Sequence, residues 1–121
     1  MKIDIDKRTF EFGIRIIKLV AALPRTTAGR TVGNQIIRSG TSVGANVEEA
    51  LGGHTKIDFA HSMNIAKKEA RETRFWLRLI IGTELLPIKK VELLLKECEE
   101  LVAILTIIVK NSNDRKVITY K

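Results

Sequence analysis

The chain has 121 residues, a length that suits one domain able to bury a core without cross-links. Its 45% hydrophobic content excludes a wholly disordered chain, and its single cysteine, Cys98, excludes an internal disulfide. No uncharged apolar run is long enough to span a membrane, and the charged opening "MKIDIDKRTFEF" does not resemble a secretory signal, so we expect a cytoplasmic protein. The net charge of +7 favours anionic partners, nucleic acid first.

The first predicted helix covers about residues 6–23 and ends before Pro24. Four apolar residues recur at helical spacing and predict its core-facing side: Phe10, Ile14, Ile17 and Ala21. Charged residues take the other side: Lys7, Arg8, Glu11, Arg15 and Lys18.

The stretch "QIIRSGTSVGANVEEALGG" (residues 35–53) could be a glycine-rich loop that cradles a phosphate, or a helix with very close neighbours. Its apolar and small residues follow steps of four and three, which a phosphate loop has no reason to keep: Ile36, Gly40, Val43, Val47 and Ala50. We therefore predict a helix over about 28–51. Gly40 and Gly44 each cost about 1 kcal/mol of helix propensity, which is tolerable where a neighbouring backbone comes close.

The third predicted helix covers about residues 55–82, with the capping pattern "TKID" at its start. Its core seam resembles a heptad pattern: Phe59, Met63, Ala66, Ala70, Thr73, Leu77 and Ile80. A second face carries a basic stripe, which we define as Lys67, Lys68, Arg71, Arg74 and Arg78. Such a stripe could contact phosphates without reading bases, or it could be an ordinary solvated face partly paired with Glu49 or Glu72.

The fourth predicted helix runs from Pro87 to about residue 111. Its seam is Val91, Leu94, Cys98, Leu101, Leu105 and Ile108. Residues 112–121 lose the period, and we expect a mobile tail or a segment taken up by a neighbour. The whole pattern predicts one all-α domain over 1–121, an antiparallel up-down-up-down four-helix bundle.

The first and fourth helices carry more apolar residues than one core face needs. The surplus predicts a second buried face and hence self-association. The alternative is a scatter of exposed aliphatic side chains, which is common on monomers.

Polar residues near the small-residue seam predict a semi-buried ion-pair network, with two of them completing hydrogen bonds. The charged members are Arg38, Glu49, Glu69 and Glu72, and the hydrogen-bonding members are Ser39 and Asn46. A ferritin-like metal site would need two Glu-x-x-His pairs, whereas the chain offers only Asp58-x-x-His61, once. We therefore expect no metal, and we expect no cofactor. We also expect no enzymatic activity, because the sequence shows no catalytic constellation and no histidine accompanies Cys98 in the pattern.

Two blocks, "GNQIIRSGTSVGANVEEA" (33–50) and "KKEARETRFWL" (67–77), resemble the bacterial four-helix-bundle proteins of intervening sequences in 23S ribosomal RNA genes. The opening "FEFGIRIIKLVAALPRTTAGR" is similar to that family's first helix and turn. The resemblance implies a homo-oligomeric ring, a pentamer. A related branch, the accessory protein of diversity-generating retroelements, binds a reverse transcriptase and nucleic acid through a basic surface.

These observations together predict a non-enzymatic oligomer that binds RNA or DNA-RNA hybrids electrostatically. The predicted contacts are the basic stripe, with help from Arg15 and Lys18. The alternative is an oligomeric scaffold or adaptor that binds a partner protein, such as a reverse transcriptase.

Overall fold

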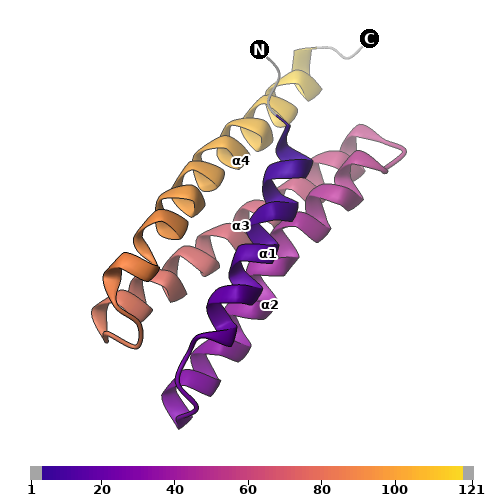
Figure 1. The fold of residues 1–121 in the computed structure, drawn as a ribbon. Coiled ribbons are helices and arrows are strands. Elements are labelled where there is room, and N and C mark those ends of the chain that lie inside the picture. Colours follow the sequence, from indigo (N-terminus) through magenta and orange to yellow (C-terminus); the bar gives the residue numbers. More distant parts are fainter. Residues whose placement is uncertain (1–3, 119–121) are drawn as a thin grey trace.

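The structure, a computed structural model, describes residues 4–118, with side chains for residues 4–112. It consists of four long α-helices and one short 3₁₀ turn, and the described residues contain no strand (Figure 1). The elements are α1 (Ile5–Ala21), α2 (Thr27–Leu51), α3 (Lys56–Gly82), η1 (Ile88–Lys90) and α4 (Glu92–Ile118). The predicted all-α four-helix bundle is confirmed.

Side-chain caps account for the starts of α2 and α3. The Thr26 hydroxyl accepts a hydrogen bond from the Gly29 N–H at the start of α2, and the Thr55 hydroxyl does the same for the Asp58 N–H in α3. The fourth helix differs from its predicted bounds of 87–111. Residues 88–90 form η1 instead, so that α4 begins at Glu92, and α4 continues to Ile118. Part of the expected tail is thus helical, while residues 119–121 lie outside the described residues.

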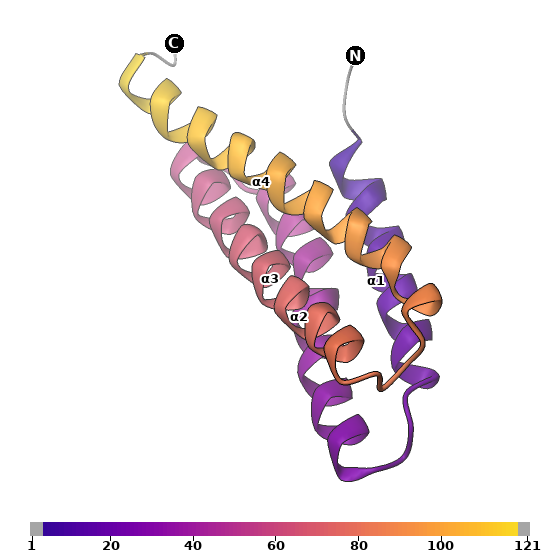
Figure 2. The same ribbon diagram turned by 90° about the vertical axis from the view of Figure 1, so that its left-hand side faces the viewer.

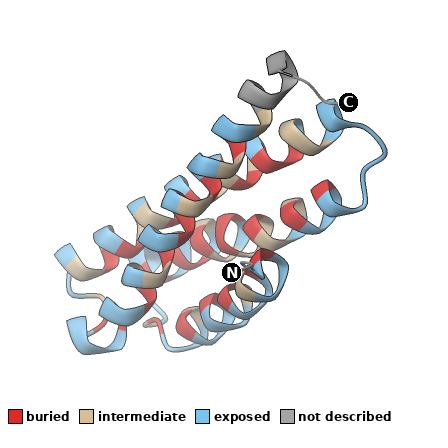
Figure 3. Ribbon diagram, turned by 90° about the horizontal axis from the view of Figure 1, so that it is seen from above, coloured by how far each residue is buried: buried red, intermediate tan, exposed pale blue. Residues whose placement is uncertain are grey.

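The helices pack mainly on their neighbours in the chain. α2 lies against both α1 and α3, and α4 lies against α3, whereas α1 and α4 touch at few points (Figures 1 and 2). The core runs along the inner faces of the helices, where the burial pattern repeats turn by turn (Figure 3). The predicted core seam of α2 is fully buried; those of α3 and α4 are buried except for the partly buried Phe59 and Ile108.

The predicted core side of α1 is wrong. The buried residues are Ile5, Thr9, Phe12, Ile16 and Leu19. Phe10, Ile14 and Ile17 are instead 69%, 40% and 51% exposed, and Ala21 is exposed as well. α1 carries two apolar stripes of similar spacing, and spacing alone does not decide which of them faces the core.

Contact with the glycines of α2 determines which apolar stripe of α1 faces the core. An ideal Cβ placed on Gly40 would lie 2.7 Å from Cγ1 of Ile16, so the bulky Ile16 side chain fills the space that glycine leaves. A Cβ on Gly44 would lie 3.0 Å from the carbonyl oxygen of Thr9, which brings the two backbones together. Because residues 27–51 are helical throughout, the phosphate-loop alternative for this stretch is excluded.

Candidate nucleic-acid interface

The basic stripe lies along one flank of α3, beside the buried seam. Lys68, Arg71 and Arg78 are exposed, while Lys67 and Arg74 are half-buried. Within the described part of the chain, none of the five has a carboxylate oxygen within 4.0 Å. Glu72, a suspected partner of the stripe, pairs with Arg38 instead. Among residues 4–112, the stripe is therefore a row of cations without ion-pair partners.

Arg74 marks the edge of the stripe nearest α4. Its charge acts on the Cys98 thiol, which donates a hydrogen bond to the Ala70 carbonyl oxygen at 3.3 Å. Burial raises the pKa of Cys98 to about 12, although the positive charge of Arg74 works in the opposite direction. The thiol is thus a buried, protonated core group, as expected from its place on the seam.

Arg15 and Lys18, the two predicted helpers, do not join the stripe. They lie on α1, which sits diagonally across the bundle from α3 (Figure 2). There they line a pocket of about 400 Å³ together with Lys89 and Lys90 of η1. The seven predicted cations therefore form two separate groups, and the sequence analysis missed Lys89 and Lys90 because only the fold brings η1 beside α1.

The predicted polar network is smaller than expected. Arg38 donates to Glu72 at 2.9 Å and lies 3.9 Å from Glu69, so α2 and α3 share one ion-pair cluster. One carboxylate oxygen of Glu69 is buried without a hydrogen bond to any described residue. The indole N–H of Trp76 donates to Glu72 at 3.2 Å, a contact that the sequence analysis did not include.

The other predicted network members lie apart from this cluster. The hydroxyls of Ser39 and Thr73 are 2.8 Å apart in the core. The Asn46 amide donates to the Ser42 carbonyl oxygen in its own helix, and Glu49 is exposed with no ion pair among the described residues. Only the Ser39–Thr73 contact joins α2 to α3, and none of these residues forms an open chemical site.

A second ion-pair cluster ties α1 to α4. Arg8 donates to Glu97 at 2.6 and 3.0 Å and to Glu100 at 3.0 Å. The hydrogen bond to Glu97 is the largest of the effects that raise the pKa of Arg8, with burial opposing it. The sequence contains the complementary charges, but their pairing depends on the register between two helices about 90 residues apart.

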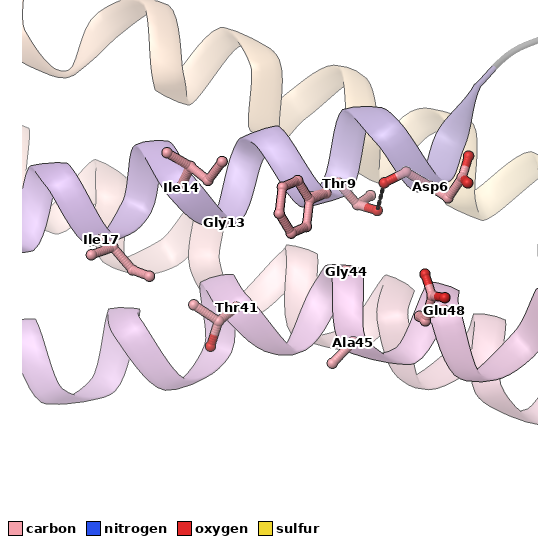
Figure 4. Close-up of a pocket in the computed structure, with 10 residues that line it drawn as sticks. Asp6, Thr9, Gly13, Ile14, Ile17, Thr41, Gly44, Ala45 and Glu48 are labelled. Carbon is pink, nitrogen blue, oxygen red and sulfur yellow. Dashed lines mark hydrogen bonds between the residues drawn. The ribbon is translucent and has the colours of Figure 1, made fainter.

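The exposed apolar stripe of α1 forms a groove with α2, of about 680 Å³ (Figure 4). Phe10, Ile14 and Ile17 line one wall. The α2 wall consists of Thr41, Gly44, Ala45 and Glu48, so that one carboxylate, together with Asp6 of α1, also lines the groove. An apolar groove of this kind on a small domain is typical of a protein-binding surface.

The described residues contain no group of three or more His, Cys, Asp or Glu side chains placed to hold a metal ion. No helix in the same part of the chain is long and apolar enough to cross a membrane. The surface features that remain are the basic stripe, the cationic pocket and the apolar groove.

Helix order, packing and surface together define an antiparallel four-helix bundle with a cationic flank on α3. The chain belongs to the 23S rRNA-intervening sequence protein family, whose model matches residues 1–107. The fold is also similar to a crystal structure of a protein of unknown function from the S23 ribosomal protein family of Bacteroides thetaiotaomicron. The two chains are 37% identical, with a TM-score of 0.82, over 88% of this chain and 98% of the other. A search of curated proteins found no match.

Proposed function

We propose that this protein is a non-enzymatic homo-oligomer that binds RNA, or another nucleic acid, electrostatically through the basic stripe. The observation that carries the proposal is the absence of ion-pair partners for all five stripe cations among the described residues. Arg8 and Arg38, by contrast, are held by carboxylates. Cations that are already paired lose those contacts when they bind phosphate, whereas the stripe cations are available.

The chemistry of the stripe suits phosphates better than bases. Lysine and arginine neutralise backbone phosphates regardless of sequence, and counterion release then provides most of the affinity. Phe75 is the only exposed Phe, Tyr or Trp side chain on the described part of α3, so base stacking contributes little. RNA is the first nucleic acid to test, because the family's name refers to 23S rRNA.

Self-association is supported by the apolar groove between α1 and α2. A monomer would leave Phe10 and Ile17 more than half exposed, and burial of such side chains is favourable at roughly 25 cal/mol per Å². The resemblance to the family implies a pentameric ring. In a ring the stripe would be repeated once per subunit, and the repeated positive field would strengthen binding to a long polyanion.

The test is RNA binding as a function of salt. A triple variant reverses the charge of the three stripe arginines, of which Arg74 is half-buried: Arg71→Glu, Arg74→Glu and Arg78→Glu. We expect loss of retention on single-stranded RNA with helicity intact, because three phosphate contacts become repulsive. In the unmodified protein the logarithm of the binding constant should fall steeply with the logarithm of salt, by about 0.7 per phosphate contact.

The matched control makes the same change in net charge elsewhere. It replaces three exposed cations on α1, on α2 and in the link between them: Lys7→Glu, Arg25→Glu and Arg30→Glu. If the control loses as much affinity as the stripe variant, net charge governs binding and the stripe assignment is wrong. If the stripe variant binds RNA normally, the proposed function falls.

The alternative function is that of a scaffold or adaptor for a partner protein, and the apolar groove favours it. This alternative predicts a complex with the partner protein that survives nuclease and high salt. Ile14→Glu should abolish that complex, whereas the stripe variant should leave it intact. The RNA-binding proposal predicts that the stripe variant abolishes RNA retention, whereas Ile14→Glu weakens it only as far as it dissociates the oligomer. Light scattering of both variants shows whether Ile14→Glu acts by dissociating the oligomer.

A further inference from the structure

Four cations converge on the pocket between α1 and the start of α4. Arg15 and Lys18 come from one face of α1, and Lys89 and Lys90 come from η1. The remaining lining is apolar: Leu19, Ala22, Leu86, Leu93 and Leu94. This cationic pocket has a volume of about 400 Å³.

No carboxylate lines the cationic pocket. None of its four cations has a carboxylate oxygen within 4.0 Å among the described residues. The nearest acid along α1 is Glu11, one turn before Arg15. On α4, the exposed Glu92 follows Lys90 by two residues without lining the pocket, and Glu97 is already bound by Arg8. Charges of one sign beside apolar, low-dielectric walls produce a concentrated positive field, which attracts anions of high charge density.

The pocket differs from the stripe in shape, and the difference indicates a different ligand. The stripe lies along the side of a helix, where internal phosphodiesters with one negative charge each can pass. The pocket is a shallow recess that is open to solvent, and it can receive a group at the end of a strand. A terminal phosphate monoester carries about −1.5 to −2 charges at neutral pH, more than any internal phosphate.

We infer that the cationic pocket binds the terminal phosphate monoester of a nucleic acid strand, with Arg15, Lys18, Lys89 and Lys90 as its ligands. The inference rests on the proposed function and adds a preference for strand ends to it. The apolar wall of Leu19 and Leu93 offers a surface for the terminal ribose and base. Internal phosphates of the same or another strand remain with the stripe on α3.

The experiment compares 12-nucleotide RNAs of one sequence that carry a 5′-phosphate, a 3′-phosphate or hydroxyls at both ends. They compete, unlabelled, against a labelled RNA for the full-length protein. All three contain the same number of phosphodiesters, so the stripe contributes equally to each. We expect at least one phosphorylated form to compete about tenfold better than the hydroxyl form, since several charge-assisted hydrogen bonds form only with the end group.

Paired variants assign this preference to the pocket. Lys89→Gln with Lys90→Gln should remove the preference and leave the affinity of the hydroxyl form unchanged. Arg71→Gln with Arg78→Gln on the stripe should lower the affinity for all three RNAs equally and leave the preference for a phosphorylated end intact. All four side chains are exposed, and circular dichroism checks that both variants fold.

The results separate the inference from the proposed function. Equal competition by the three RNAs, or a preference that survives the Lys89 and Lys90 changes, would overturn the inference while stripe-dependent binding stands. If millimolar inorganic phosphate erases the preference, the pocket takes free phosphate rather than strand ends, and the inference is again overturned. If no RNA binds under any condition, the proposed function fails and the inference fails with it.

Discussion

Replacement of Gly40 by alanine tests the close packing of α1 against α2. The added Cβ would lie 2.7 and 2.8 Å from the two γ carbons of Ile16, which is fully buried. Overpacking of this kind costs typically 1–3 kcal/mol, whereas alanine gains about 1 kcal/mol of helix propensity over glycine. We therefore expect Gly40→Ala to lower the free energy of unfolding by about 1 kcal/mol.

Gly13→Ala is the matched control, because Gly13 is also inside a helix. There the added Cβ would come no closer than 4.0 Å to the nearest atom, the Cα of Thr41. The same substitution should raise the free energy of unfolding by about 0.5–1 kcal/mol. The two variants should thus differ by roughly 2 kcal/mol in urea denaturation followed by far-ultraviolet circular dichroism at one protein concentration.

A double-mutant cycle assigns the penalty to Ile16. Ile16→Ala removes both γ carbons and leaves a cavity that costs about 2–5 kcal/mol by itself. In that background Gly40→Ala should become neutral or stabilising, since its methyl group enters the vacated space. If Gly40→Ala stabilises the original protein as much as Gly13→Ala does, the close approach of the two helices is wrong.

Three further predictions concern the core and the α2–α3 interface. Cys98 should react with thiol reagents only as fast as the protein unfolds, and rapid labelling of the folded protein at pH 8 would contradict this burial. Because burial raises the pKa of Cys98 to about 12, ionisation of the thiol should lower the free energy of unfolding as pH rises from about 9 towards 12. Thr73→Val should lower the free energy of unfolding by about 1–2 kcal/mol, because the buried Ser39 hydroxyl loses its partner at 2.8 Å. Adding Ser39→Ala should recover part of that loss in the same urea assay. Arg38→Met should destabilise the protein more than the double change Arg38→Met with Glu69→Leu, since the single change leaves a partly buried carboxylate unpaired. If the single variant loses no more free energy of unfolding than the double variant, Glu69 is solvated.

The sequence predicts the fold well because each helix carries its own local signals. The steps of four and three in α2, the Thr55 cap and the seams of α3 and α4 all depend on contacts within one helix or on its own amphipathic face. The stripe on α3 could be placed for the same reason, since five residues on one helix keep their relation in any fold. Whether they were paired could not be foreseen, because that depends on the neighbouring helices.

The features that the sequence could not show depend on relations between elements. α1 has two apolar stripes, and only the recess at Gly40 shows that Ile16 faces the core while Phe10 faces outward. The cationic pocket needs η1 beside α1, although Arg15 and Lys89 are far apart in the chain. The Arg8–Glu97 ion pair likewise requires the antiparallel register of α1 and α4.

The packing of each helix mainly on its neighbour in the chain has a consequence for how the protein folds. Most of its contacts between helices join helices that are consecutive in the chain, because α1 and α4 touch so little. Chains with such local contacts close short loops first and tend to reach the native state within microseconds to milliseconds. A nascent chain could thus add one helical hairpin at a time, and α4 could join last without disturbing the pair formed by α1 and α2.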